Sequence, residues 1–110
     1  MELSHSLHAP GTAVIKVAGK VMMGTVEDEI VELVEELLGE GKRIIVFDLG
    51  GITSLDSTGV GQFISSFNKV TTKGGEMRMA GATGHVFHTF HVSLLDQVFP
   101  FYPTVEAAMA

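Results

Sequence analysis

The sequence predicts one α/β domain, in which a small, mixed but mostly parallel β-sheet of four to five strands is flanked by about four α-helices. Two observations lead to this fold class. Short β-branched or apolar runs alternate along the chain with longer segments that carry apolar residues at helical spacing. The length of 110 residues, with 45% hydrophobic content, suits one core, so residues 1–110 are expected to form a single domain.

Four segments have the character of strands. Residues 13–18 are β-branched and end at a glycine, and residues 43–49 are almost continuously apolar, as in a central strand covered on both faces. Residues 76–80 alternate methionine with charged residues, which predicts a half-exposed strand. Residues 101–102 precede a proline and predict a short edge strand, while residues 2–9 alternate too weakly to separate a strand from a tail.

The helices are predicted from their apolar spacing. Residues 26–38 carry one apolar stripe, with Thr25 as the expected N-cap. A second helix opens after Asp56 and closes near Lys73, and its two phenylalanines, Phe63 and Phe67, lie at core spacing. Residues 83–91 and 104–108 predict two shorter helices.

Composition excludes several functions. Seven Lys and Arg residues against thirteen Asp and Glu give a net charge of −6, which repels a phosphate backbone, so nucleic acid is not an expected partner. The absence of cysteine excludes disulfides, thiolate metal sites and a cysteine nucleophile. The absence of cysteine suits a cytoplasmic protein. The longest aliphatic and aromatic run, residues 44–47, is far short of the roughly 20 residues that span a bilayer, so no membrane partner is expected.

Seven carboxylates lie between Glu27 and Glu40, a stretch without a single basic residue. This acidic face could contact a basic partner or could simply be solvated. Charge runs on helices are usually solvated, which favours the second interpretation.

One motif has both an order and a spacing that are informative. Asp48 ends the buried strand, and eight residues later the segment Asp56-Ser57-Thr58-Gly59-Val60-Gly61 opens a helix. With the elements around it, from about residue 13 to the C-terminus, this arrangement resembles the bacterial anti-sigma factor antagonists, which are stand-alone STAS domains. The resemblance implies a STAS-type sandwich for the whole chain.

The resemblance also implies a function. In that family a serine/threonine kinase, which is also the anti-sigma factor, phosphorylates the hydroxyl residue directly after the motif aspartate. That residue is Ser57 here, with Thr58 as a secondary candidate. The unphosphorylated antagonist binds the anti-sigma factor and releases the sigma factor, and a PP2C-type phosphatase restores the binding form. The protein would therefore be a regulatory ligand without cofactor, not an enzyme.

The chemistry of the motif supports such a switch independently. A serine at a strand-to-helix corner lies near the surface, beside the free N–H groups of the helix. Phosphorylation adds about −1.5 to −2 charge, which the helix dipole partly stabilises and Asp56 opposes. A partner surface shaped for a neutral hydroxyl would meet a desolvated dianion, so binding should fall while the fold persists. The alternative is ordinary capping, because Ser and Thr are preferred N-caps.

The expected contact residues extend beyond Ser57 itself. Asp56, Thr58 and the glycines belong to the same corner, and Gly59 and Gly61 would let another backbone approach closely. The family usually carries an acidic residue in the loop after the second strand, where this chain has Lys20-Val21-Met22. Met22 and Met23 could form a contact surface for a different partner, since methionine adapts to irregular surfaces, or could fill the edge of the core.

The sequence signals for other kinds of chemical site are weaker. His85, His88 and His91 follow at intervals of three, but the third lies 120° around a helix from the first, so only two could converge and a metal site is not expected. The serine at 57 lacks the glycine two positions earlier that a nucleophile elbow needs, and the Walker signature is absent. Two further hypotheses stay open: a STAS interaction module of a larger signalling or transport assembly that is not phosphorylated, and a small enzyme or nucleotide binder that uses the Asp56 corner.

Overall fold

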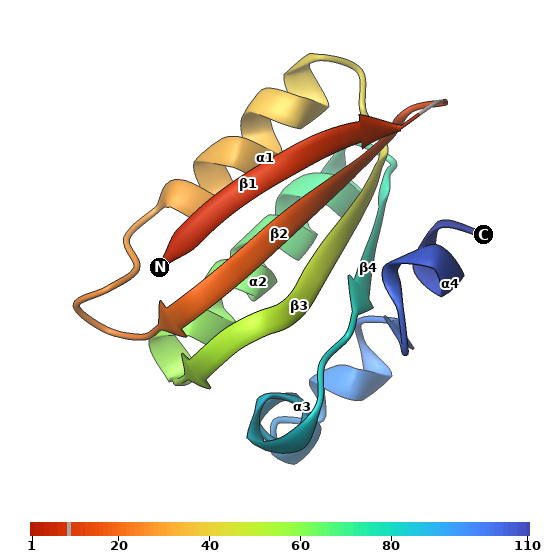
Figure 1. Ribbon diagram of the computed structural model, residues 1–110. Coiled ribbons are helices and arrows are strands. Elements are labelled where there is room, and N and C mark those ends of the chain that lie inside the picture. Colours follow the sequence, from red (N-terminus) through yellow and green to blue (C-terminus); the bar gives the residue numbers. More distant parts are fainter. Residues whose placement is uncertain (9) are drawn as a thin grey trace.

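The computed structural model describes residues 1–8 and 10–110, which form a five-stranded sheet with helices packed on it (Figure 1). Ala9, the last residue of the expected first segment, lies outside the described residues. The elements in chain order are β1 (Glu2–His8), β2 (Thr12–Val21), α1 (Glu29–Gly39), β3 (Ile44–Leu55), α2 (Ser57–Thr72), β4 (Glu76–Ala80), α3 (Gly84–Val92), the 3₁₀ turn η1 (Leu95–Gln97), β5 (Phe101–Tyr102) and α4 (Val105–Met109).

The strands lie in the order β1-β2-β3-β4-β5. β1 pairs antiparallel with β2, and every following pair is parallel. Each parallel pair needs a crossover, which α1, α2 and α3 supply in turn. The predicted mixed, mostly parallel α/β sandwich is confirmed, and the segment that could have been a strand or a tail is an edge strand.

The core has two parts, one on each face of the sheet (Figure 1). The larger part lies under α1, α2 and α3 and contains Phe47 and Phe63, whose rings meet edge-on at a centroid distance of 5.1 Å. Phe63 in turn contacts Phe90 of α3 at 5.7 Å, so the aromatic rings join β3, α2 and α3. The expected packing role of Phe63 is confirmed, since its side chain is fully buried.

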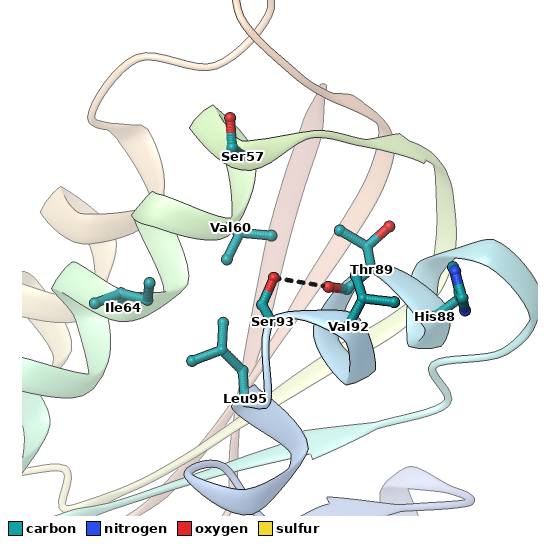
Figure 2. A pocket seen from close by; sticks show the side chains of 8 residues that line it. All are labelled: Ser57, Val60, Ile64, His88, Thr89, Val92, Ser93 and Leu95. Carbon is teal, nitrogen blue, oxygen red and sulfur yellow. Dashed lines mark hydrogen bonds between the residues drawn. The ribbon is translucent and has the colours of Figure 1, made fainter.

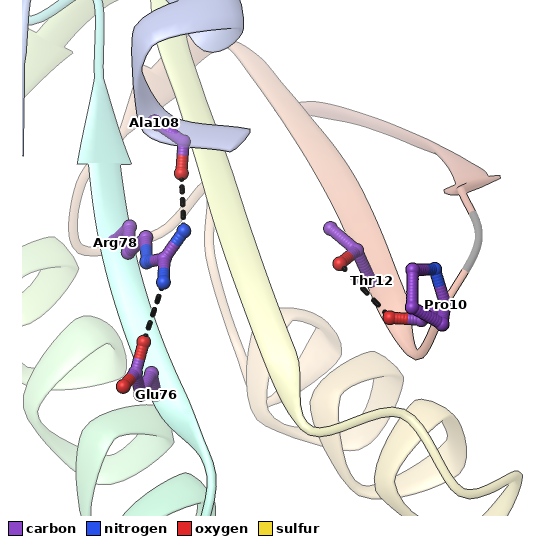
Figure 3. Close-up of polar contacts among 5 residues, drawn as sticks. All are labelled: Pro10, Thr12, Glu76, Arg78 and Ala108. Carbon is purple, nitrogen blue, oxygen red and sulfur yellow. Dashed lines mark hydrogen bonds and ion pairs between the residues drawn. The ribbon is translucent and has the colours of Figure 1, made fainter. Parts of the chain in front are cut away.

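The smaller part of the core lies under α4. Val14, Val46 and Ala80 of the sheet pack there against Ala108. Arg78 fixes the end of this helix, because its Nη1 donates to the carbonyl oxygen of Ala108 at 2.7 Å while Nη2 pairs with Glu76 at 2.6 Å (Figure 3).

Three predicted boundaries are wrong by more than one residue, and all three errors lie near the site. β2 does not end before Gly19 but continues to Val21. β3 does not end at Leu49 but runs through Gly50-Gly51 to Leu55. α1 begins at Glu29 with Asp28 as N-cap, not after Thr25. The hydroxyl of Thr25 instead donates to the carbonyl oxygen of Lys20 at 2.8 Å and accepts from the N–H of Met22 at 3.1 Å, so it closes the loop after β2.

Across residues 1–8 and 10–110, none of the helices combines the length and the apolar character that crossing a bilayer requires.

Candidate functional site

The site lies at the edge of the sheet where β2 and β3 end. Val21 and Leu55, the last residues of these strands, are register partners. The loop after β2 and the first turn of α2 therefore leave the sheet side by side. This places Met22 and Met23 next to the Asp56 corner, although more than 30 residues separate them in the sequence.

Asp56 joins these two segments. Its Oδ1 accepts from the N–H of Gly59 at 3.0 Å and its Oδ2 accepts from the N–H of Met23 at 3.0 Å. These hydrogen bonds, with that from Gly59 the larger contribution, hold the pKa of the Asp56 carboxyl below its ordinary value of 3.8. Asp56 is therefore the N-cap of α2 and also fixes the methionine loop beside it.

The two glycines of the motif have different surroundings. A Cβ on Gly59 would lie 2.0 Å from the carbonyl oxygen of Val21, which no backbone could accommodate without moving. The backbone that approaches Gly59 closely is thus the chain's own, and Gly59 is buried. A Cβ on Gly61 would meet nothing within 4 Å, so this glycine leaves space for an outside group.

Ser57 is the first residue of α2 and its side chain is exposed, while Thr58 beside it is half-buried. The capping bond to the helix comes from Asp56, and in the part of the chain that the structure describes no side-chain hydrogen bond engages the Ser57 hydroxyl. Capping therefore does not explain Ser57, and its hydroxyl is accessible to an enzyme or a partner.

A groove of about 380 Å³ begins at Ser57 and runs between α2 and α3 (Figure 2). We call it the α2–α3 groove; it is lined by Ser57, Val60, Ile64, His88, Thr89, Val92, Ser93 and Leu95. Its walls are mostly aliphatic, and its polar lining consists of hydroxyls and one imidazole. Such a surface fits an apolar side chain flanked by hydrogen-bonding groups.

Exposed apolar residues gather around this groove. Ile64 and Val92, which line it, are 40% and 62% exposed, and Leu94, between the lining residues Ser93 and Leu95, is 61% exposed. Met23 is the most exposed of these large apolar residues at 76%, so it does not fill the core edge, whereas Met22 is half-buried. A set of exposed apolar side chains beside one hydroxyl is typical of a protein-binding surface.

The histidine series does not converge. His91 stacks on Phe87, and its Nδ1 lies 2.8 Å from Oδ2 of Asp96, so it closes the turn after α3. His88 lines the α2–α3 groove and His85 is exposed at the start of α3. Within residues 1–8 and 10–110, no three His, Asp or Glu side chains are placed to hold a metal ion.

Of the residues that line the groove, only Ser57 is among the contact residues predicted from the sequence. The other predicted residues belong to the corner beside it, where Asp56 joins the methionine loop to the start of α2. The α3 wall, with Thr89 and Val92, was not predicted. Its signal was present but weak: Val92 and Leu94 are apolar at positions outside the stripe formed by Val86 and Phe90.

Comparisons with known proteins identify the family. The STAS domain family model matches residues 6–108. An anti-sigma factor antagonist from Mycobacterium paratuberculosis has a similar structure, with a TM-score of 0.84, 24% identity, and coverage of 98% of this chain and 90% of that chain. The Bacillus cell fate determinant SpoIIAA in its phosphorylated form gives a TM-score of 0.73 at 18% identity, covering 96% of each chain.

A sulfate transporter family protein from Wolinella succinogenes is also similar, with a TM-score of 0.75, 10% identity, and coverage of 94% and 85% of the two chains. A search of curated proteins gave no significant match. At these identities the solved structures establish the fold, and the family model establishes the relationship. The chain belongs to the STAS domain family.

Proposed function

We propose that this protein is an anti-sigma factor antagonist: a regulatory ligand that sequesters an anti-sigma factor with serine kinase activity, thereby releases a sigma factor, and is switched off by phosphorylation of Ser57. The observation that carries the proposal is the exposed Ser57 hydroxyl at the mouth of an apolar groove. A PP2C-type phosphatase would return the protein to its binding form.

Binding would use both walls of the α2–α3 groove. An apolar side chain of the partner enters between Val60 and Val92, and the exposed Met23 beside the helix start covers further apolar surface. Burial of this surface provides affinity, at roughly 25 cal/mol per Å² of apolar area before the costs of association. The open space at Gly61 lets the partner's backbone approach α2.

A phosphate on Ser57 would act on binding rather than on folding. The side chain is exposed, so about −1.5 to −2 charge at this position stays solvated in the free protein. In the complex, the same charge would be desolvated next to the Asp56 carboxylate. The aliphatic lining of the groove provides no cation to offset it, and His88 is the one imidazole there.

The modification site can be tested directly. The purified protein is incubated with the anti-sigma kinase and ATP, and the product is analysed by intact-mass and peptide mass spectrometry. One phosphate on Ser57 is expected, with none on a Ser57→Ala variant and an unchanged yield on Thr58→Ala. Phosphate that persists in Ser57→Ala would contradict the assignment.

Binding is tested by calorimetry with the same partner. Ser57→Asp should keep its circular-dichroism spectrum and melting temperature but bind at least about tenfold more weakly, equivalent to about 1.4 kcal/mol. Val92→Glu should also weaken binding, because it places a charge in the groove, while Glu35→Gln on α1 serves as an exposed control away from the groove. Unchanged affinity of both groove variants would exclude this surface.

A second candidate function is an interaction module of a larger signalling or transport assembly, without phosphorylation. Two observations favour it: Met22 stands where the antagonists usually have an acidic residue, and a sulfate transporter family protein shares the fold. The two experiments above separate the functions, because a module of this kind would take up no phosphate from the kinase and would bind its assembly equally well as wild type and as Ser57→Asp.

A further inference from the structure

The two edges of the sheet differ in how they are protected against pairing with another strand. β5 consists of two residues flanked by Pro100 and Pro103, and prolines and short length are common ways of blocking an edge. β1 is seven residues long, pairs on one side with β2, and contains neither lysine nor proline. Its outer side therefore presents unpaired backbone N–H and C=O groups over its whole length.

The sequence of β1 is a palindrome at its centre. Residues 3–7 read Leu-Ser-His-Ser-Leu in both directions, and the flanking residues are Glu2 and His8. An antiparallel pair of identical strands related by a two-fold axis at His5 would thus place like against like: Leu3 opposite Leu7, and Ser4 opposite Ser6. At both ends a carboxylate, Glu2, would face an imidazole, His8.

We propose that β1 is a self-association surface, through which a second copy of this chain pairs antiparallel about a two-fold axis at His5 and extends the sheet across both molecules. A dimer of this kind is isologous, the commonest symmetry among soluble oligomers. The two-fold axis would pass midway between the His5 residues of the two copies. Such an axis is possible whether this pair is a hydrogen-bonded or a non-hydrogen-bonded pair of the antiparallel ladder.

The side chains of β1 suit this partner. Leu3, His5 and Leu7 lie opposite Val17, Ile15 and Ala13 of β2, so they share the helix-covered face of the sheet. Leu7 is 53% exposed, and Leu3 of the second copy would cover it. Glu2 and His8 lie on the other face, where Glu2 of each copy would face His8 of the other, so that no like charges are opposed.

The proposed dimer leaves the α2–α3 groove free. Figure 1 shows β1 at one edge of the sheet and α3 on the β3–β4 side, away from it. Both copies could bind a partner at once, so self-association through β1 does not depend on the proposed function and can be tested without the kinase.

A cross-linking experiment tests the register, since the chain contains no cysteine of its own. In the proposed pair residue 5 faces residue 5, with Cβ atoms about 4.5–5.5 Å apart, near the distance that a disulfide needs. His5→Cys should therefore form a covalent dimer on mild oxidation. Ser4→Cys and Leu7→Cys face Ser6 and Leu3 of the second copy, so they should cross-link at least about tenfold more slowly. Equal rates for the three variants would indicate random collision and overturn the proposal.

Sedimentation equilibrium of the full chain tests the association without a cross-link. Because a paired edge is a small interface, we expect a Kd on the order of 100 µM. Leu7→Lys should raise the Kd at least tenfold, whereas Val98→Lys, at a similarly exposed apolar position after η1 (48% against 53%), should leave it unchanged. A wild-type protein that stays monomeric at roughly ten times that concentration, or a Leu7→Lys protein that associates as well as wild type, would refute the proposal.

A charge-reversal cycle tests the ends of the strand. His8→Glu places two carboxylates opposite each other and should weaken association, and adding Glu2→Lys should restore it. Failure of the double variant to recover would contradict the proposed pairing of residue 2 with residue 8, even if the protein dimerised.

Discussion

The two walls of the α2–α3 groove are held in different ways. α2 begins at a fixed point: the Asp56 side chain accepts from Gly59 and from Met23, and Gly59 packs against the end of β2. α3 begins at Thr83, whose side chain makes no capping bond. After its C-cap, Ser93, comes Leu94, the one described non-glycine residue with positive φ, at +60°.

The two walls therefore have different roles in the groove. The wall that carries Ser57 is positioned by strand ends, so the proposed phosphate acceptor keeps a defined place. The α3 wall is held mainly by Val86 and Phe90, which are the buried residues of this nine-residue helix, and it presents Val92 to solvent. We infer that α3 is the wall that adjusts to a partner, because fewer contacts oppose its movement.

The largest effect on stability is expected for Gly59→Ala, which tests how the start of α2 is held. The new Cβ would lie 2.0 Å from the Val21 carbonyl oxygen, so the start of α2 must separate from β2. We expect a loss of about 3–5 kcal/mol in the free energy of unfolding, measured by urea titration. The matched control is Gly61→Ala, which meets nothing within 4 Å and should stabilise the helix by about 0.5–1 kcal/mol. Equal effects would refute the assigned contact.

The next effect concerns Asp56. Asp56→Ala removes both hydrogen bonds and should lower Tm by roughly 5 °C, whereas Asp56→Asn keeps one acceptor oxygen and should lose about half as much. The folded pKa lies below the ordinary 3.8, so this contribution is complete above about pH 5 and is lost as the pH falls through the folded pKa. Thermal melts of wild type and Asp56→Ala should therefore converge as the pH is lowered through the folded pKa, and a constant difference would contradict the carboxylate's role.

The sequence was sufficient for the fold because periodicity and composition determine it locally. The apolar run of β3 and the apolar stripes of α1 and α2 predicted the layers, and the Asp56–Gly61 motif predicted the strand-to-helix corner. What failed were positions set by distant contacts. Thr25 looks like a helix cap in the sequence, but its hydroxyl bonds to Lys20 and Met22 and the helix starts later.

Distant contacts also determine which residues line the groove and which of the two motif glycines is buried, so neither could be predicted from the sequence. Which residues of α3 face α2 depends on where Phe90 meets Phe63 and Phe99, and no local pattern encodes that contact. Gly59 and Gly61 are equivalent in the sequence, yet the parallel register of β2 and β3 brings the Val21 carbonyl against Gly59 and leaves Gly61 open.

A smaller effect is expected at the end of the α3 wall. A side chain with left-handed backbone costs about 1–2 kcal/mol, and glycine avoids this cost but loses about 0.5–1 kcal/mol to the entropy of the unfolded chain. Leu94→Gly, at a position that is 61% exposed, should therefore stabilise the protein by about 0.5–1 kcal/mol in urea titration. Leu94→Ala retains the Cβ and should give no gain, and a gain as large as that of glycine would show that the φ angle is not the cause.

The last comparison distinguishes a residue that only occupies a cap position from one that caps, and its smallest expected effect is at Thr83. Thr83 and Thr104 both precede a helix with extended backbone, but Thr104 accepts from the N–H of Ala107 at 3.1 Å while Thr83 makes no such bond. Thr104→Ala should cost about 1 kcal/mol, whereas Thr83→Ala should change the free energy of unfolding by less than about 0.5 kcal/mol. If Thr83→Ala costs as much as Thr104→Ala, the start of α3 is fixed after all, and the adaptability assigned to this wall would have to come from its C-terminal end at Leu94.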